Sequence, residues 1–247
     1  MANTARNPIN GDDGNNKLIG TKDDDIINGF GGNDRMWGLA GDDYMSGGDG
    51  RDLMRGGDDD DIIVGNKGDD WMLGEDGDDR LVWNNGDGSD VMRGGKGFDA
   101  TQVNFFTDLV NNDIDNDDTA RIETAGKGIS FARTELNGQT EAGLFALDIA
   151  QVEALEVNFG KGHDTAELVG DVVSNILMLL DGGKGVDTLD LSELSEGAKV
   201  ELDVDEENAV DLDGNPLNQP GLVTVGHDIT VLNDFENVIG TEFEDQI

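Results

Sequence analysis

Large apolar side chains recur every nine residues along roughly the first hundred positions of the chain. They occupy the eighth position of each nine-residue unit, and nine of the ten residues found there are large and apolar. These residues are Leu18, Ile27, Met36, Met45, Met54, Ile63, Met72, Leu81, Met92 and Thr101. The last three residues of each unit predict a short strand, because side-chain alternation along a strand points the central residue inward.

The six residues that precede each strand are rich in Gly and Asp, a composition typical of tight turns. The units open at Gly11, Gly20, Gly29, Gly38, Gly47, Gly56, Gly65, Gly74, Asn85 and Gly94. A two-residue insertion, Trp83 and Asn84, precedes the last two units. The sixth positions are Asn16, Asp25, Asp34, Asp43, Asp52, Asp61, Asp70, Asp79, Asp90 and Asp99. Chance composition does not place nine Asp in ten units at one phase.

Two units make one coil of eighteen residues, with strands on opposite sides and turns stacked in two columns. Residues 11–102 are therefore predicted to form an all-β, parallel β-roll of ten units, preceded by a flexible N-terminus at 1–10. Aromatic residues make up only 5% of the 247 residues, so a large globular core over the whole length is not expected.

Charge narrows the choice of partners. The chain has 55 Asp and Glu against 16 Lys and Arg, a formal charge of −39, and this self-repulsion opposes a compact state. Nucleic acid is excluded as a partner because phosphate recognition requires a basic face. Hard carboxylate oxygens suit Ca²⁺, whereas a solvated acidic surface would explain the same composition without any metal.

The position of the carboxylates favours metal. Stacked turns place the sixth-position Asp of one unit beside that of the unit two further on, so each Asp can bridge neighbouring ions. Backbone carbonyls of fourth-position glycines would complete the oxygen cages, namely Gly32, Gly41, Gly50, Gly68, Gly77 and Gly97. We therefore predict several calcium ions and expect binding to be coupled to folding.

Three departures from the repeat change this prediction locally. Asn16 is neutral, so the first coil is expected to bind weakly. Asp23 and Asp59 replace the fourth-position Gly, which predicts a strained turn or an additional carboxylate. The insertion at Trp83 is expected to interrupt the stacking and to remove one ion.

The units resemble the GGxGxDxUx nonapeptide of RTX (repeats-in-toxin, hemolysin-type) proteins, most clearly at 47–55 and 94–99. The resemblance implies a non-catalytic module of a secreted bacterial protein that folds on binding extracellular calcium. Residues 1–10 lack the apolar segment of a signal peptide, so type I secretion is the export route that the resemblance implies. No apolar run could span a bilayer, and the absence of Cys excludes disulfides.

Residues 103–247 are expected to form an irregular, strand-rich β-helical region, because apolar and polar residues alternate in segments such as 128–133 and 144–149. Isolated turns of the repeat type recur at 159–167, 182–190 and 240–247. They add Asp164, Asp187 and Asp245 to the predicted calcium ligands. From residue 187 to residue 240 the sequence resembles the lead-in to the roll of secreted RTX metalloproteases.

The last repeat-like unit begins at Gly240 and the sequence stops at Ile247. We expect the chain to be a piece of a longer protein. The alternative is that this end docks onto another chain, and an unpaired roll end would also allow end-to-end self-association.

Other candidate chemistry is sparse. His163 and His227 lie in no HExxH motif and no GxSxG motif is present, so we expect no catalytic activity. The acidic segments 113–118 and 203–213 lack the closing Glu of an EF-hand loop and are interpreted as solvated loops. His163 is interpreted as incidental.

The outward strand positions leave two further hypotheses open. One sheet presents Trp37 and Trp71 among Arg35, Arg55 and Arg93, a surface that would suit an extracellular polysaccharide in an adhesin or matrix protein. A second packed interface is the simpler explanation of the same side chains. Alternatively, the chain is the secretion and folding appendage of an enzyme whose catalytic domain lies elsewhere.

Overall fold

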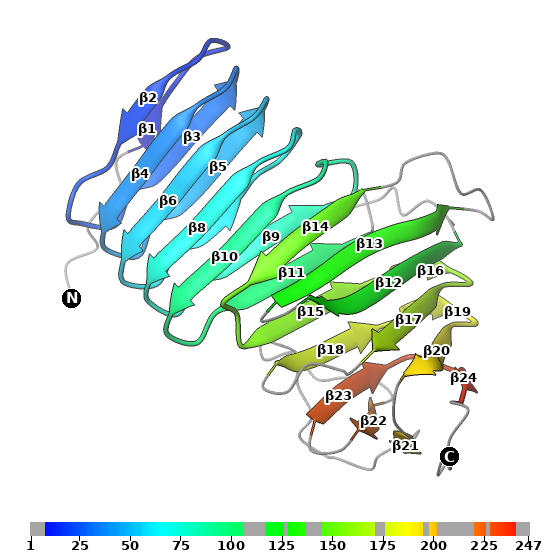
Figure 1. Ribbon diagram of the computed structural model, residues 1–247. Coiled ribbons are helices and arrows are strands. Elements are labelled where there is room, and N and C mark those ends of the chain that lie inside the picture. Colours follow the sequence, from blue (N-terminus) through cyan, green and yellow to red (C-terminus); the bar gives the residue numbers. More distant parts are fainter. Residues whose placement is uncertain are drawn as a thin grey trace. The chain divides into compact units, whose positions relative to one another are not determined.

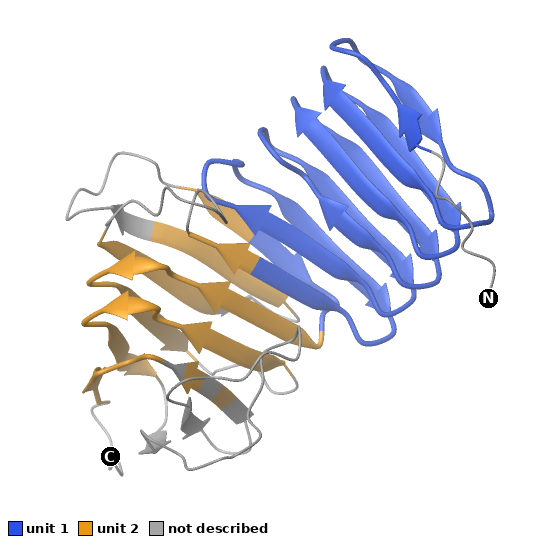
Figure 2. Cartoon of the chain, turned by 180° about the vertical axis from the view of Figure 1, so that it is seen from behind, with its two compact units in different colours: residues 1–102, 148–152 blue, residues 103–147, 153–247 orange. Residues whose placement is uncertain are grey.

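The protein is described from a computed structural model, in which every element among the described residues is a β-strand (Figure 1). The described residues are 8–105, 117–125, 128–136, 145–170, 176–194, 198–201, 220–225 and 228–240. Asp245, the segment 203–213 and most of the segment 113–118 lie outside them. The chain divides into two compact units, residues 1–102 with 148–152 and residues 103–147 with 153–247 (Figure 2).

Unit 1 is a parallel β-roll, as predicted. Its strands are β1 (Pro8–Asn10), β2 (Lys17–Ile19), β3 (Ile26–Gly31), β4 (Arg35–Ala40), β5 (Tyr44–Asp49), β6 (Leu53–Asp58), β7 (Ile62–Val64), β8 (Trp71–Asp76), β9 (Arg80–Asn84), β10 (Val91–Lys96) and the start of β11 (Ala100–Asn104). Each strand pairs in parallel with the next but one along the chain. Odd-numbered strands therefore form one sheet and even-numbered strands the other. Residues 148–150 of β14 (Ala146–Ala150) extend the even sheet beside β10.

The core of unit 1 consists of the eighth-position side chains. In the even sheet Met36, Met54, Met72 and Met92 are in register, and in the odd sheet Ile27, Met45, Ile63 and Leu81 are in register. All eight are fully buried, which confirms the predicted inward face. Burial of each such side chain contributes about 1.5–3 kcal/mol, and flexible Met side chains fill the narrow interior between the sheets.

The turns hold the backbone in a conformation that favours Gly. The fourth position has positive φ in Gly50, Gly68 and Asp59, and a Cβ added to Gly68 would lie 1.4 Å from the carbonyl oxygen of Gly50. The second position also has positive φ, including at Phe30 and Leu39, where an L side chain is strained. Close stacking of the coils therefore favours Gly at the fourth position, although Asp59 adopts a positive φ there.

The two-residue insertion does not interrupt the stack, so that expectation was wrong. The backbone N–H of Asp70 donates to Oδ1 of Asp90 at 2.8 Å, the same contact that links uninterrupted coils. Trp83 is 1% exposed and its Nε1 donates to the carbonyl of Gly88 at 2.9 Å. The added residues thus lie at the end of β9, and a local turn follows in which the backbone N–H of Asp87 donates to the carbonyl of Asn84 at 3.0 Å.

Unit 2 has longer and less regular coils. Its strands are the remainder of β11 and β14 with β12 (Asp118–Ala125), β13 (Gly128–Leu136), β15 (Ala154–Asn158), β16 (Lys161–Gly162), β17 (Thr165–Gly170), β18 (Leu177–Asp181), β19 (Lys184–Gly185), β20 (Thr188–Leu194), β21 (Ala198–Glu201), β22 (Pro220–Val225), β23 (Asp228–Asn233) and β24 (Asn237–Ile239). Parallel pairing persists in β12–β17–β20–β24 and in β15–β18–β23, whereas β12–β13, β21–β22 and β22–β23 are antiparallel.

An aromatic cluster fills the interior of unit 2. The ring of Phe105 stacks on that of Phe159 with centroids 5.0 Å apart, and the rings of Phe131 and Phe145 stack at 6.0 Å. Bulky rings span a wider interior than single Met side chains do. Among the described residues no helix is long and apolar enough to cross a membrane.

Candidate metal sites in the stacked turns

The sixth-position carboxylates of unit 1 form two buried columns. In the first column, Oδ1 of each Asp accepts a hydrogen bond from the backbone N–H of the residue one coil earlier, at 2.7–2.8 Å; its members are Asp34, Asp52, Asp70 and Asp90. In the second column, the backbone N–H of Asp25 donates to Oδ1 of Asp43 in the same way, at 2.7 Å. The same hydrogen bond, at 2.9 Å, links the successive members Asp43, Asp61, Asp79 and Asp99. Every member is at most 4% exposed. The sequence pattern thus places the predicted ligands together.

The second carboxylate oxygen gives the strongest indication of a bound cation. Oδ2 is buried without a hydrogen-bond partner in Asp34, Asp52, Asp61, Asp70, Asp79, Asp90, Asp164 and Asp187. A carboxylate only accepts hydrogen bonds, and leaving a charged oxygen buried and unpaired is costly. A cation at each of these atoms would remove that cost, so the residues present fit the calcium that the repeat implies.

Side chains alone cannot complete such a site. Within the part of the chain that the structure describes, no group of three or more acidic, His or Cys side chains could hold a metal ion. Each turn supplies one buried column carboxylate, so the remaining ligands are expected to be backbone carbonyls, as Ca²⁺ accepts. The predicted carbonyls of Gly32 and Gly50 lie in these turns, each carbonyl against the fourth-position Gly of the next coil.

Without a bound metal, burial in the turns raises the pKa values of several column carboxyl groups. Burial raises the pKa of Asp61 to about 8, and the charges of its column neighbours Asp79 and Asp43 add to the rise. Burial likewise raises the pKa of Asp70 to about 8 and that of Asp52 to about 6. Bound cations would favour the charged forms and lower these pKa values.

A second ladder of hydrogen bonds runs along the outside of the turns, through the fifth-position side chains. Asp42 accepts a hydrogen bond at Oδ1 from the backbone N–H of Asp60, and Asp60 accepts one from Asp78. This outer ladder runs opposite to the inner one, since each residue donates to the previous coil. Asp59 also contributes an additional carboxylate, because the backbone N–H of Gly41 donates to its Oδ2 at 3.2 Å.

Asn16 begins the first column with a neutral side chain. Its Oδ1 accepts from the backbone N–H of Asp12 at 2.7 Å, and its own N–H donates to Oδ1 of Asp34. The amide therefore continues the hydrogen-bond geometry without adding charge. The weaker calcium binding expected of the first coil stays a prediction.

A third column runs through unit 2. The backbone N–H of Asp118 donates to Oδ1 of Asp164 at 2.7 Å, and the N–H of Asp164 donates to Oδ1 of Asp187 at 2.8 Å. The N–H of Asp187 then donates to Oε2 of Glu236 at 2.8 Å. Asp164 and Asp187 were predicted as column members, whereas Asp118 had been interpreted as part of a solvated loop and Glu236 was missed.

His163 is not incidental. Its Nδ1 accepts a hydrogen bond from the backbone N–H of Val186 at 3.0 Å, and the backbone N–H of His163 donates to Oδ1 of Asp117 at 2.8 Å. The ring thus takes the place of an outer-ladder carboxylate in unit 2. The position of His163 directly before Asp164 was the available signal, since it matches the fifth position of the repeat.

Comparison with known families agrees with this geometry. The RTX calcium-binding nonapeptide repeat matches residues 10–45, 46–81 and 85–100. The crystal structure of the extracellular lipase LipA from Serratia marcescens aligns with 15% identity and a TM-score of 0.31, over 74% of this chain and 37% of the lipase. A likeness this distant supports no argument about activity. No curated protein gave a significant match.

The chain is therefore an all-β protein that carries RTX calcium-binding nonapeptide repeats in a parallel β-roll. Such repeats imply calcium sites and are typical of extracellular proteins exported by type I secretion.

Proposed function

We propose that the chain is a non-catalytic module of a secreted bacterial protein and that calcium binding drives the folding of its roll. The buried, unpartnered Oδ2 atoms of the columns carry this proposal. Each requires a cation in the folded state, and the unfolded chain has no preformed site. The free energy of binding is then also free energy of folding.

The same coupling would serve export. Extracellular modules bind calcium with dissociation constants of about 10⁻⁴ to 10⁻³ M. Cytosolic calcium lies far below that range, so the acidic chain would stay unfolded inside the cell and fold after reaching the medium. The formal charge of −39 supports this behaviour, because repulsion dominates until ions bind.

Circular dichroism during a calcium titration in chelex-treated buffer tests the proposal, with Mg²⁺ as the matched control. Calcium should induce the β spectrum cooperatively. Mg²⁺ should act poorly, because it demands near-octahedral geometry and retains its waters. An unchanged β spectrum in excess chelator, or equal folding in Mg²⁺, would contradict coordination-driven folding.

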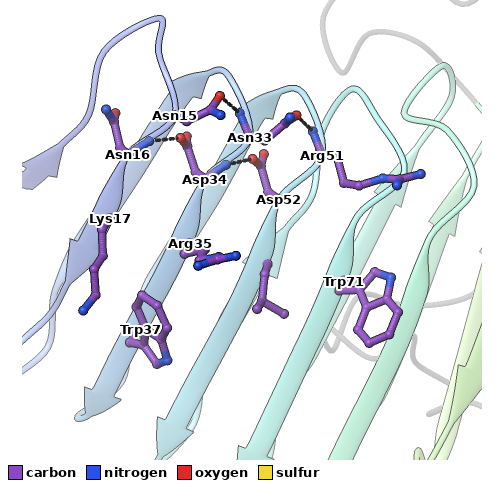
Figure 3. A pocket seen from close by; sticks show the side chains of 11 residues that line it. Asn15, Asn16, Lys17, Asn33, Asp34, Arg35, Trp37, Arg51, Asp52 and Trp71 are labelled. Atoms are coloured by element: carbon purple, nitrogen blue, oxygen red, sulfur yellow. Dashed lines mark hydrogen bonds between the residues drawn. The ribbon is translucent and has the colours of Figure 1, made fainter.

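A groove on the even sheet of unit 1 favours a second function, binding of an acidic polysaccharide. The groove has a volume of about 880 Å³, and the residues that line it include Lys17, Arg35, Trp37 and Trp71 (Figure 3), together with Leu53. Lys17, Arg35, Leu53 and Trp71 lie side by side in register on four consecutive strands of that sheet. The groove is therefore partly aromatic and partly basic, and the column carboxylates of Asp34 and Asp52 also line it.

The free charges on this surface are fewer than the sequence suggested. Arg55 pairs with Glu75 at 3.1 Å and Arg93 pairs with Asp148 at 2.6 Å. Arg35 has no carboxylate partner among the described residues, and Lys17 lies 5.3 Å from the centroid of the Trp37 ring. Trp71 is 54% exposed. Arg35 and Lys17 would thus hold the carboxylates of a uronic-acid polymer, and Trp71 would stack on its sugar rings.

Affinity for polygalacturonate in calcium, compared with neutral dextran, tests this second function. Arg35→Ala and Trp71→Ala should each weaken polygalacturonate binding by about tenfold, equivalent to ~1.4 kcal/mol. Tyr44→Ala, on the outward face of the odd sheet, should leave it unchanged. Equal losses in all three variants, or equal binding of dextran, would exclude a specific groove.

A further inference from the structure

A buried arginine lies at the head of the third column. Arg133 of β13 is 3% exposed, and its Nε lies 3.1 Å from Oδ1 of Asp118, which is 2% exposed. The guanidinium carbon lies 4.8 Å from the ring centroid of Phe105 and 5.4 Å from that of Phe145. The charge is thus enclosed between a carboxylate and two aromatic faces, a geometry that suits Arg in a dry interior.

The sequence around Asp118 makes room for this side chain. In unit 1 the residue two positions after each described column Asp is Met, Ile or Leu, except after Asp99. Two positions after Asp118 and Asp164 it is Ala120 and Ala166, which are paired in register and fully buried. Arg133 pairs across the β12–β13 hairpin with Ala120. The small side chains leave the space beneath the turn that a long side chain can occupy.

Two carboxylates act on this guanidinium. Burial lowers the pKa of Arg133, and the charges of Asp118 and Asp164 oppose that change. For Asp118, burial raises the pKa to about 6 and the charge of Arg133 lowers it. Arg does not lose its proton in proteins, so it supplies a permanent positive charge at this point.

We infer that Arg133 is a built-in cation that takes the place of a calcium ion between Asp118 and Asp164. The inference rests on the proposed function, since it assigns calcium to the other column positions and withholds it only from the position between Asp118 and Asp164. A fixed guanidinium repels a divalent cation and already neutralises the buried carboxylate. The β12–β13 hairpin would therefore keep its order without calcium, in contrast to the strands of unit 1.

Calcium stoichiometry, measured by calorimetry and native mass spectrometry, tests the inference on matched variants. Asp52→Asn should lose bound calcium, whereas Asp118→Asn should bind as many ions as the unmodified chain. Arg133→Met keeps the length of the side chain but removes its charge, and it should gain one ion. Arg133→Met combined with Asp118→Asn should return to the original number. Loss of an ion in Asp118→Asn would overturn the inference, and an unchanged Asp52→Asn would instead contradict the proposed function.

Hydrogen exchange in chelator gives an independent readout. Amides of residues 118–123 and 128–133 should be at least tenfold better protected than those of β4, β6 and β8, and Arg133→Met should abolish that difference. If the whole chain is protected in chelator, the Arg133→Met comparison still decides: selective loss of protection in the hairpin supports the inference, and its retention overturns it. Exchange in the hairpin as fast as in unit 1 would also overturn it.

Discussion

The two units differ in how the negative charge of their buried carboxylate columns is neutralised. Unit 1 stacks its carboxylates at intervals of 18 residues, or 20 across the insertion, over a core of Met, Ile and Leu that offers no counter-charge. Unit 2 stacks its carboxylates at intervals of 46, 23 and 49 residues, and it places Arg133 against the first of them. A column of buried Asp can therefore be neutralised by ions from solution or by a side chain, and only the first makes folding depend on calcium.

Replacement of a glycine at a close contact between coils of unit 1 should have the largest effect. A Cβ at position 68 would lie 1.4 Å from the carbonyl oxygen of Gly50, whereas a Cβ at position 86 would meet no atom within 4 Å. Both glycines have positive φ. Gly68→Ala should prevent stable folding of the roll in saturating calcium, and Gly86→Ala should cost about 1–2 kcal/mol from strain alone. Equal midpoints of thermal unfolding for the two variants would show that the coils are not packed so closely.

Replacing a large core side chain by Ala should destabilise the chain more in the aromatic interior of unit 2 than in the methionine-rich interior of unit 1. Phe131→Ala should destabilise the chain by about 3–5 kcal/mol, because the rings of Phe105 and Phe145 around it are stiff and cannot fill the cavity. Met54→Ala should cost only about 2–3 kcal/mol, since the flexible Met36 and Met72 flank it in register and can partly fill the cavity. Denaturant unfolding in saturating calcium measures both, and a larger loss for Met54→Ala would reverse the expected order.

Protonation of the buried carboxyl groups at low pH should partly replace calcium in stabilising the roll. The folded, metal-free pKa values of Asp61 and Asp70 are raised to about 8, above the value of about 4 expected of an unfolded chain. A raised pKa means that the folded state binds protons more readily, so the stability of the metal-free roll rises as the pH falls from about 8 towards 4. Circular dichroism in chelator should show β structure appearing over that range. In calcium the same protons compete with the ion, so the calcium midpoint should rise. A pH-independent spectrum in chelator would contradict the burial of these carboxyl groups.

Relief of backbone strain should give the smallest effect. Leu39, the second residue of its nine-residue unit and near the end of β4, has a φ of 92° and is 48% exposed. Leu39→Gly should stabilise the roll by about 0.5–1 kcal/mol, since Gly adopts positive φ without strain. Leu73→Gly, within strand β8, is the control and should destabilise it by about as much. Two losses of similar size would indicate that strain at the second position is negligible.

The regular repeat explains why unit 1 could be predicted so fully. A fixed phase identifies both the inward eighth position and the sixth-position Asp, and each coil repeats the environment of the last. Unit 2 lacks that phase, so Asp118 had no large apolar residue two positions later to identify it as a column member. Arg133 reaches the third column across the β12–β13 hairpin, and Glu236 reaches it through a hydrogen bond over 49 residues; the spacing of a nine-residue repeat reveals neither contact.

The structural effect of the insertion at Trp83 also could not be predicted from the spacing of the repeat. Two extra residues were expected to break the stack, but a buried indole and a local turn absorb them while Asp90 keeps its place below Asp70. Whether the coils stay stacked across the insertion thus depends on the packing of a single large side chain, Trp83. A nine-residue pattern contains no information about such compensation.

Calorimetric calcium titration of four Asp→Ala variants tests the central claim most directly. Asp52 and Asp61 are buried column members, whereas Asp42 and Asp69 belong to the exposed outer ladder, where Asp69 also pairs with Arg51 at 3.3 Å. Asp52→Ala and Asp61→Ala should lower the ion stoichiometry and raise the calcium needed for folding, at a cost of about 3–5 kcal/mol. Asp42→Ala and Asp69→Ala should keep the stoichiometry and cost roughly 0–1 kcal/mol. Similar losses from both pairs would contradict the account, because the columns would then be a solvated acidic repeat and not a series of ion cages.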